Sequence, residues 1–328
     1  MLILNAADVR TTLPMATVIT ATQQAYAALS NGQAEIPLRS RLAIPPHNGT
    51  SLFMPAYVKT AQSEALAVKI VSLFPGNLAK GLPFIHAAVL VLEAHSGLPL
   101  ALLEGGTLTA IRTGAASGAA TDLLARPDAK TAAIFGAGAQ ARTQLEAICT
   151  VRDIETAWIF DLEPQKAQTL VADLAGKGKI CSDLRVAPDP AEAASLADII
   201  CTATTSKEPV YPSEAVRPGT HINGVGSYTL DMLENPPEIY RRACAFVDSR
   251  EAVLAESGET VAAIQRGLLY PEEMAELGEV ILGQRPGRTS SEQITFFKSV
   301  GVAVQDAIAA QLALQNAIEL GCGQVVDW

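Results

Sequence analysis

The sequence predicts an α/β fold: a doubly wound parallel sheet domain together with a discontinuous α+β domain. From Lys130 onward, short apolar segments alternate with helical segments, which is typical of βαβ units and a parallel sheet. Before that point, five short apolar runs follow one another with almost no helix between them, which indicates antiparallel strands. The last helical stretch is expected to return to the first domain. We therefore expect one domain of residues 1–113 completed by 303–328, and a second domain of residues 114–302.

Residues 12–31 have the pattern of an amphipathic helix that ends at a turn signal. The five apolar runs that follow read PLRSRLAIP, TSLFMPAYV, ALAVKIVSLFP, FIHAAVLVLEA and LPLALLEG. At Thr107, a plausible N-cap, the pattern changes to a helix that Pro127 ends after Arg126. Small residues crowd its middle, at 114–120. This composition predicts a buried helix that joins the two domains.

The second domain is expected to contain six strands separated by helices. The strand segments read TAAIFG, TAWIFD, DLRVAP, DIICTAT, THINGVG and CAFVDS. The chain then ends in a long stretch with helical character, SSEQITFFKSVGVAVQDAIAAQLALQNAIELG. We expect this whole stretch to be helical and to complete the first domain.

Composition excludes several classes of function. A chain of 328 residues with a net charge of −10 repels phosphate backbones and shows no basic stripe, so nucleic-acid binding is not expected. The 5 cysteines and 4 histidines lack ligand spacing, which argues against a metal or a disulfide framework. No apolar run reaches the length of a membrane span. The N-terminal segment lacks the features of a secretory signal, so a cytoplasmic location is expected.

A glycine motif lies between the first strand and helix of the second domain. In AAIFGAGAQA, Gly136-x-Gly138-x-x-Ala141 follows a strand and opens a helix, the context that makes this motif informative. Gly136 allows a tight turn, and Gly138 lets the backbone approach a pyrophosphate. Asp161 ends the next strand, where its carboxylate can accept hydrogen bonds from ribose hydroxyls and repel a 2′-phosphate. Because no arginine follows it in DLEPQK, a Rossmann-type site for NAD(H) rather than NADP(H) is predicted.

Four cations occupy unusual places in the expected first domain. Lys69 lies in the apolar strand EALAVKIVSLFP, Arg39 and Arg41 lie in PLRSRLAIP, and Arg112 lies in the small-residue helix. A buried ammonium needs a negative partner or a path to water. Few acidic residues lie in these segments, so convergent cations would form a site for a bound carboxylate. If PLRSRLAIP is a regular strand, Arg39 and Arg41 share one face.

At these blocks the chain resembles the ornithine cyclodeaminase and mu-crystallin family. The matching stretches are PLRSRL, FMPAY, VKIVSLFPGN, LTAIRTGAASGAA, FGAGAQA, the strand that ends at Asp161, and ELGEVILGQRPGRTSSEQITFFKSVGVAVQDA. The resemblance covers almost the whole length. It implies a Rossmann domain, a second domain that dimerises through its sheet, and action on α-amino or α-imino acids with a nicotinamide cofactor.

The resemblance also implies roles for individual residues. Arg39, Lys69 and Arg112 match the family's substrate-carboxylate cations, so the partner of Lys69 is expected to be the ligand. Arg112 is also expected to contact the cofactor, and Val300 to line the substrate. The glycine motif itself predicts dinucleotide contacts at Gly136 and Gly138. The further contacts that match the family are Ala139, Gln140, Asp161, Thr202, Gly224, Val225 and Ser299.

One segment bears on the reaction. The cyclodeaminases of this family have an aspartate two residues after VG, whereas GVGSYTLDMLE has Tyr228 there, Asp231 three residues later and Met232 in place of a lysine. We therefore expect an NAD(H)-dependent oxidoreductase that reduces an α-imino acid to the L-amino acid. Iminosuccinate, iminopyruvate and a cyclic ketimine such as pyrroline-2-carboxylate are the candidate substrates. The alternatives are an ornithine cyclodeaminase that forms proline, and a non-catalytic mu-crystallin-like binding protein.

The proton donor and the substrate's size stay open at this point. Lys69 is a candidate for carboxylate orientation and proton relay, because a lysine among apolar residues can have a lowered pKa. His86, on the next strand, and water are the other candidates. Arg41 could serve a second carboxylate of the substrate, or could be a solvated or dimer-interface residue.

Overall fold

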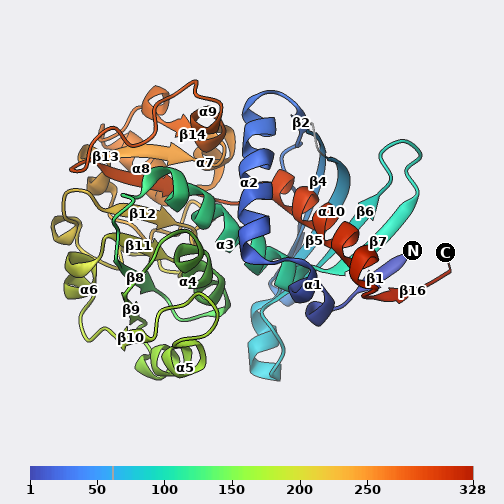
Figure 1. Cartoon of the computed structure of the whole chain (residues 1–328). Helices are drawn as coiled ribbons and strands as arrows, with labels where there is room; N and C mark the ends of the chain where they lie inside the picture. Colours follow the sequence, from blue (N-terminus) through green and yellow to red (C-terminus); the bar gives the residue numbers. More distant parts are fainter. Residues whose placement is uncertain (61–62, 328) are drawn as a thin grey trace. The chain divides into compact units, whose positions relative to one another are not determined.

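The computed structural model describes residues 1–60 and 63–327, which form two compact units (Figure 1). Unit 1 comprises Met1–Arg112 and Val302–Trp328, and unit 2 comprises Thr113–Gly301. Residue 328, which falls in the expected segment 303–328, lies outside the described residues. Unit 1 is thus assembled from both ends of the chain, and each unit has its own eight-stranded sheet.

The sheet of unit 1 is mixed and mostly antiparallel. Its strands are β1 (Leu2–Leu4), β2 (Ala34–Glu35), β3 (Ser40–Ile44), β4 (Gly49–Lys59), β5 (Glu64–Leu73), β6 (Ile85–Leu92), β7 (Pro99–Glu104) and β16 (Gln324–Val325). They lie in the order β16-β1-β7-β6-β5-β4-β2, with β3 also paired to β4. Strands β3 to β7 pair antiparallel with one another, which confirms the five strands predicted from the apolar runs, and β7 pairs parallel with β1 on its other side. The short strands β1, β2 and β16 were not predicted.

Helices cover one face of this sheet. These are α1 (Ala6–Thr12), α2 (Met15–Ser30) and α10 (Ala303–Leu320), and α10, red in Figure 1, crosses β4, β5 and β6. Short 3₁₀ turns lie at Pro45–His47 and Pro75–Lys80. Along β4 and β5 every second side chain is buried, as expected for strands with one covered face. Lys69 lies opposite Met54 and Val89, both buried, so it points to the helix-covered face.

The sheet of unit 2 is entirely parallel. Its order is β10 (Asp183–Val186), β9 (Thr156–Phe160), β8 (Thr131–Phe135), β11 (Ile199–Thr202), β12 (His221–Gly224), β15 (Ile294–Lys298), β13 (Ala243–Val247) and β14 (Ala275–Glu276). The strand order reverses between β8 and β11, which marks the crevice where doubly wound sheets bind ligands at their carboxyl edge. This sheet confirms the predicted fold class.

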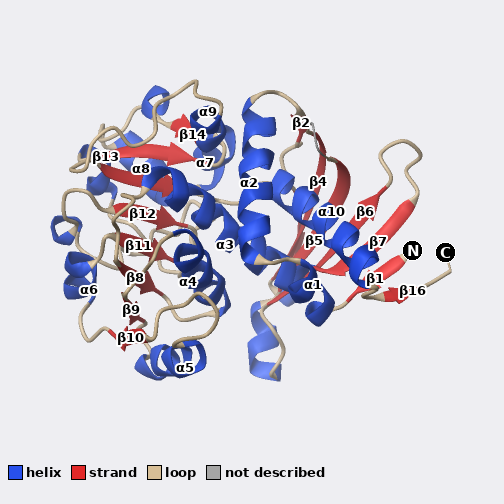
Figure 2. Cartoon of the chain, in the orientation of Figure 1, coloured by secondary structure: helices blue, strands red, loops and turns tan. Residues whose placement is uncertain are grey.

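Helices surround the parallel sheet (Figure 2). They are α3 (Gly105–Leu124, shared with unit 1), α4 (Ala139–Val151), α5 (Pro164–Leu174), α6 (Pro190–Leu196), α7 (Arg250–Glu256), α8 (Gly258–Gln265) and α9 (Leu277–Ile281), with 3₁₀ turns at Ser213–Ala215, Pro237–Arg241 and Pro271–Glu273. Apolar side chains of β8, β9 and β11 form a core with those of α4 and α5. None of the helices in the described ranges is long and apolar enough to cross a membrane.

Two predicted elements differ from the structure. The C-terminal stretch is not helical throughout, because Ile294–Lys298 forms strand β15 and α10 begins only at Ala303. The segment ITFFK is β-branched and aromatic and is buried over its whole length between β12 and β13, where a strand satisfies its backbone. The other difference is the start of α3. This helix begins at Gly105 because the Glu104 carboxylate, rather than Thr107, accepts hydrogen bonds from the first free N–H groups.

Candidate functional site

The glycine turn after β8 has the geometry of a phosphate-binding loop. Gly136 has φ +95°, and a Cβ there would lie 2.7 Å from the Ala203 carbonyl oxygen, so only glycine fits. Gly138 is exposed, and a Cβ added to it would meet nothing within 4 Å. It is the N-cap of α4, a helix of 13 residues whose N-terminus has no side-chain cap. The N–H groups of this terminus can therefore receive an anion.

Asp161 lies beside this turn, directly after β9. Its Oδ2 accepts a hydrogen bond from the Ala137 N–H at 2.8 Å, and its Oδ1 accepts one from Glu163 N–H at 2.8 Å. The carboxylate is therefore held at the carboxyl edge of the sheet, next to the glycine turn. Gln140 Oε1, in the first turn of α4, is buried and accepts no hydrogen bond from any described residue. A glycine turn, an open helix N-terminus and an adjacent carboxylate fit a dinucleotide.

The ends of β11 and β12 form the other side of the crevice. Val225 N–H donates to the Thr202 carbonyl at 3.0 Å, and Thr202 Oγ1 accepts from Asn235 Nδ2 at 3.0 Å. Gly224 is buried, and a Cβ there would lie 2.7 Å from Asn235 Nδ2. Asn235 thus holds the ends of both strands, a contact that the sequence did not reveal.

A buried carboxylate organises the segment after β15. Asp248 Oδ2 accepts hydrogen bonds from Ser299 Oγ at 2.7 Å, Val300 N–H at 3.0 Å and Gly301 N–H at 2.8 Å. Ser299 and Val300, both expected near the reacting groups, are therefore held by one residue at the end of β13. Asp248 was not among the predicted site residues.

Three charged groups meet in the core of unit 1. Lys69 Nζ on β5 lies 2.7 Å from Asp306 Oδ2 on α10, and Arg112 Nε on α3 lies 2.9 Å from Asp306 Oδ1. Arg112 Nη1 also donates to Gln305 Oε1 at 3.3 Å, and Gln305 Nε2 donates back to the Arg112 carbonyl. All three charged side chains are buried, with at most 7% of each exposed. The small residues of α3 and α10 let these helices carry charged groups deep into the unit.

The partner of Lys69 in this structure is therefore Asp306 of the chain itself, and the expectation that its partner is the ligand is wrong. Asp306 is 237 residues away in sequence, on a helix that packs against β5. The sequence does contain a sign that Asp306 is buried and needs a partner. It interrupts the apolar run GVAVQDAIAAQLAL in the way that Lys69 interrupts its strand. One carboxylate shared by Lys69 and Arg112 still leaves positive charge in excess when both are protonated.

Burial sets the ionisation of this cluster. Burial, reinforced by the charge of Arg112, lowers the pKa of Lys69 to about 7 against the opposing effect of Asp306. Burial also opposes ionisation of Asp306, but the charges of Arg112 and Lys69 outweigh it and lower the pKa of this carboxyl. Lys69 can therefore exchange a proton near neutral pH while Asp306 stays ionised.

Arg39 belongs to the same neighbourhood, and Arg41 lies further out. The charge of Arg39 acts on both Lys69 and Asp306, which shows that it lies near them. Arg39 is not part of a regular strand, since β3 begins at Ser40. Arg41 is exposed and lies opposite Leu52, which shares the helix-covered face with Lys69.

His86 points away from Lys69. It lies opposite Ser72 on β5, and because Ser72 is an odd number of positions from Lys69, the His86 side chain lies on the other face of the sheet. It is also exposed. His86 is therefore wrongly placed to exchange a proton with a ligand held at Lys69.

The loop after β12 carries Tyr228 and Asp231. Asp231 is exposed, with Oδ2 2.8 Å from Lys207 Nζ and Oδ1 accepting from Thr229 Oγ1. These contacts lower the pKa of Asp231 to about 2. This acid is thus engaged at the surface by the protein's own lysine.

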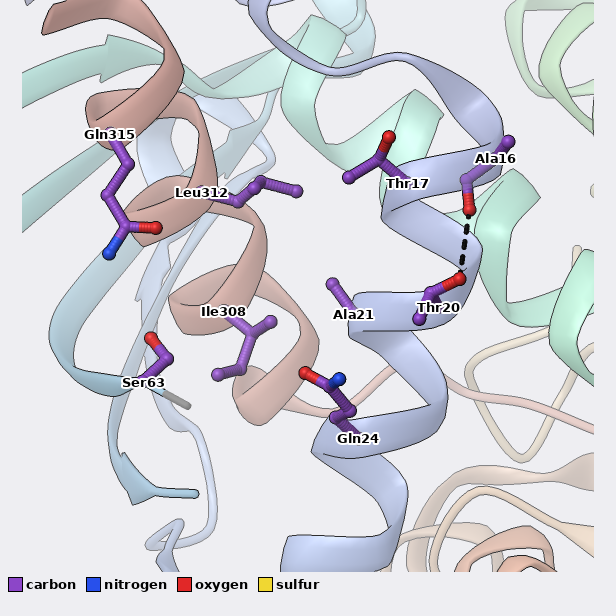
Figure 3. A pocket seen from close by; sticks show the side chains of 9 residues that line it. All are labelled: Ala16, Thr17, Thr20, Ala21, Gln24, Ser63, Ile308, Leu312 and Gln315. Carbon is purple, nitrogen blue, oxygen red and sulfur yellow. Dashed lines mark hydrogen bonds between the residues drawn. The ribbon is translucent and has the colours of Figure 1, made fainter. Parts of the chain in front are cut away.

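A groove of about 500 Å³ lies between α2 and α10 (Figure 3). It is lined by Ala16, Thr17, Thr20, Ala21, Gln24, Ser63, Ile308, Leu312 and Gln315. None of the predicted site residues is among them. Within residues 1–60 and 63–327, no group of histidine, cysteine and acidic side chains could hold a metal ion.

The chain is similar over its whole length to proteins of known activity. A Delta(1)-pyrroline-2-carboxylate reductase of Bacillus cereus is 39% identical over 330 residues, covering 100% of both chains. The structure of Thermococcus litoralis Delta(1)-pyrroline-2-carboxylate reductase in complex with NADH and L-proline is 44% identical, with a TM-score of 0.94 over 99% of this chain and 100% of that one. An archaeal alanine dehydrogenase dimer with bound NAD is 32% identical, with a TM-score of 0.91 over 100% and 99% of the two chains.

The family model described as ornithine cyclodeaminase/mu-crystallin matches residues 1–320. The expected resemblance is thereby confirmed over nearly the full length. The chain belongs to the ornithine cyclodeaminase/mu-crystallin family.

Proposed function

We propose that this protein is an NAD(H)-dependent oxidoreductase that reduces an α-imino acid to the L-amino acid. One observation carries the proposal: two buried cations, Lys69 and Arg112, share the single carboxylate of Asp306. The excess positive charge suits a bound carboxylate, and the pKa of Lys69, about 7, suits proton exchange with a neighbouring nitrogen. Relatives that reduce an imino acid or dehydrogenate an amino acid support the same reaction.

A cyclic ketimine of the pyrroline-2-carboxylate type is the first candidate substrate. Pyrroline-2-carboxylate appears in the name of the Bacillus relative. The structure of the Thermococcus relative contains L-proline, the corresponding amino acid. Iminosuccinate and iminopyruvate are the acyclic candidates. All three have a C=N bond next to a carboxylate, which is what the cluster is proposed to recognise.

The residues of unit 1 would act as follows. Arg112, held by Asp306 and Gln305, and Arg39 bind the carboxylate and orient the C=N bond. Lys69 gives its proton to the imine nitrogen, which makes the carbon a better hydride acceptor. When bound, NADH supplies the hydride, so the carbon gains a C–H bond, the nitrogen keeps the proton and the cofactor leaves as NAD⁺. Val300 lines the substrate.

The residues of unit 2 would hold the cofactor. The backbone at Gly136 and Gly138 and the first turn of α4, with Ala139 and Gln140, bind the diphosphate, and Asp161 binds the adenosine ribose. Thr202, the backbone at Gly224–Val225, and Ser299 contact the remaining half, and Arg112 reaches the cofactor from the substrate side.

Asp161 is proposed to select NADH over NADPH. Asp161→Asn keeps an oxygen for the Ala137 N–H, gives up the exposed hydrogen bond from Glu163 N–H, and removes the charge that repels a 2′-phosphate. The ratio of kcat/KM for NADPH to that for NADH should rise about tenfold or more. Asp183→Asn, at an exposed ion pair with Arg185, serves as the control and should leave the ratio unchanged. An unchanged ratio in Asp161→Asn would contradict the assignment.

The test of the function is an NADH-oxidation screen. The candidates are pyrroline-2-carboxylate, piperideine-2-carboxylate, and pyruvate, oxaloacetate or glyoxylate with ammonia or methylamine. The proposal expects stoichiometric NADH loss and L-amino acid formation with at least one of them. Proline and ammonia formed from ornithine without net NADH change would instead identify a cyclodeaminase. The ion pair of Asp231 with Lys207 at the surface argues against this outcome. Cofactor binding without turnover of any imine would identify a binding protein.

Arg41 tests the size of the substrate. Its register places it on the face of Lys69 but outside the buried cluster. If the substrate has one carboxylate, Arg41→Ala should leave kcat/KM nearly unchanged, whereas Arg39→Ala should lower it about tenfold or more. A loss in Arg41→Ala that is confined to dicarboxylic substrates would indicate that Arg41 binds a second carboxylate.

We also propose a homodimer that forms through the open face of the unit 1 sheet. On this face Val68 lies opposite Pro55 and Leu90, and Ile70 is 41% exposed, so an apolar surface faces away from the helices. The alanine dehydrogenase relative is a dimer. Val68→Arg is expected to shift the mass measured by light scattering from dimer to monomer, while Asp173→Asn, at an exposed ion pair with Arg142 in unit 2, should not.

A further inference from the structure

Unit 2 contains a second buried charged cluster that the proposed chemistry does not use. It consists of Glu234, Glu259 and Lys298, which are at most 1% exposed. Lys298 Nζ lies 3.0 Å from Glu259 Oε1 and donates to the carbonyl and the hydroxyl of Ser227 at 2.8 and 2.6 Å. The Ser227 hydroxyl donates in turn to Glu259 Oε2 at 2.6 Å. Removing three charged groups from water costs free energy that their mutual attraction need not recover. A contribution to stability therefore does not by itself explain this cluster.

Glu234 ties two loops together. One of its carboxylate oxygens accepts from Thr204 N–H at 2.5 Å, and the other accepts from Ser227 N–H at 2.6 Å. A glycine at position 226 allows this close approach of the two loops. A Cβ there would lie 2.3 Å from the Thr204 carbonyl oxygen and 2.4 Å from Glu234 Oε1. The Glu234 side chain therefore joins the segment after β11 to the segment after β12 at their first residues, and the backbone hydrogen bond from Leu233 N–H to the Ser206 carbonyl joins them further along.

The cluster extends to the strand ends themselves. Asn235, next to Glu234, donates to Thr202 Oγ1 at 3.0 Å and to Glu259 at 3.3 Å, and its Oδ1 accepts from the Tyr211 hydroxyl. Lys298 is the last residue of β15 and lies opposite Gly224, the last residue of β12. The network thus fixes the carboxyl ends of β11, β12 and β15 together.

These three strands lie on one side of the point where the strand order reverses. Asp161, proposed for the adenosine ribose, follows β9 on the other side of β8. A dinucleotide that binds across this reversal has its adenosine half at β9 and its nicotinamide half at β11 and β12. The cluster therefore supports only the nicotinamide half of the site.

We propose that Glu234, with Glu259 and Lys298, forms a positioning cluster that shapes the nicotinamide half of the cofactor site without touching the cofactor. This inference rests on the proposed function. Glu234→Gln replaces one of the two acceptor oxygens by an amide NH₂, which faces a backbone donor and repels it. One of the two loops must then move, while the hydrogen bonds from Gly136 N–H to the Phe160 carbonyl and from Ala137 N–H to Asp161 involve neither loop.

The binding of two ligands distinguishes a positioning role of the cluster from a general destabilisation of unit 2. NADH occupies both halves of the site, whereas ADP-ribose lacks the nicotinamide. By titration calorimetry, Glu234→Gln should raise the Kd of NADH about tenfold, as expected when a buried donor loses its acceptor, and leave the Kd of ADP-ribose unchanged. Ser227→Ala, which removes the hydroxyl between Lys298 and Glu259, should act in the same direction with a smaller effect.

The control is Glu238→Gln, an exposed carboxylate that pairs with Arg266 in the same unit, and it should change neither Kd. A parallel rise for NADH and ADP-ribose in Glu234→Gln, or no change for either, would overturn the proposal. If this variant does not fold, Ser227→Ala decides by the same ratio. The unsubstituted protein is measured first: if it binds neither ligand, the cofactor assignment fails, and that failure is distinct from one seen only in the variants.

Discussion

Asp306→Asn is expected to abolish most of the imine-reducing activity and to destabilise unit 1. The substitution leaves Lys69 and Arg112 buried together without their shared carboxylate. Removing one partner of a buried ion pair costs about 3–5 kcal/mol, and the free energy of unfolding should fall by that order. Because the charge of Asp306 raises the pKa of Lys69, its loss moves that pKa below about 7. The alkaline limb of the pH–rate profile should then move to lower pH.

A double-mutant cycle separates the two effects. Lys69→Met combined with Asp306→Asn removes both members of the closest ion pair, so the double variant should be more stable than Asp306→Asn alone. Asp173→Asn, which breaks an exposed ion pair with Arg142, is the matched control and should cost at most about 1 kcal/mol. If Asp306→Asn retained the original stability and pH profile, the cluster would have no role in either.

The pH dependence of the reaction should follow the ionisation of Lys69. Its pKa is lowered to about 7, so the proton it is proposed to donate is present below that pH and is lost above it. In the direction of imine reduction, kcat/KM should fall about tenfold per pH unit above about 7. In the direction of amino-acid oxidation, the neutral Lys69 amine is the required form, so kcat/KM should rise with pH up to about 7 and level off above it.

Lys69→Arg provides the sharpest version of this test. Arginine keeps the positive charge but does not release a proton in this pH range. Reduction should therefore fall about 10²–10⁴-fold, and the limb near pH 7 should disappear from the profile. The measurement is the initial rate of NADH oxidation from pH 6 to pH 10 for both proteins. A profile with the same midpoint in Lys69→Arg would assign the ionisation to another group.

Local patterns predicted most of the fold. The apolar runs that became β3 to β7 and the alternation from Lys130 onward are periodic signals that hold over several residues, and both predictions are confirmed. The prediction went wrong at Ile294–Lys298, where helical character continued on both sides of a strand. Only the gap between β12 and β13 makes this segment a strand, and that gap is created by residues far away in sequence.

The candidate site was predicted in part for the same reason. The sequence alone identifies Lys69, Arg112 and the turn at Gly136–Gly138 as candidates. A charge in an apolar segment and a glycine motif between a strand and a helix are both local signals. Their partners are not local. Asp306 and Asp248 reach these residues from other elements. Asp306 does interrupt an apolar run, but the run does not show which cation it pairs with, and the segment around Asp248 does not show that it holds Ser299.

The amino-acid sequence alone determined the fold class and the family, since these depend on patterns within short segments. The tertiary structure decided the ionic state of the site. It showed that one carboxylate of α10 serves both Lys69 and Arg112, and that His86 lies on the opposite face from Lys69. The physical reason is that a pKa depends on burial and on charges within a few ångströms, and those neighbours are assembled only when the chain folds.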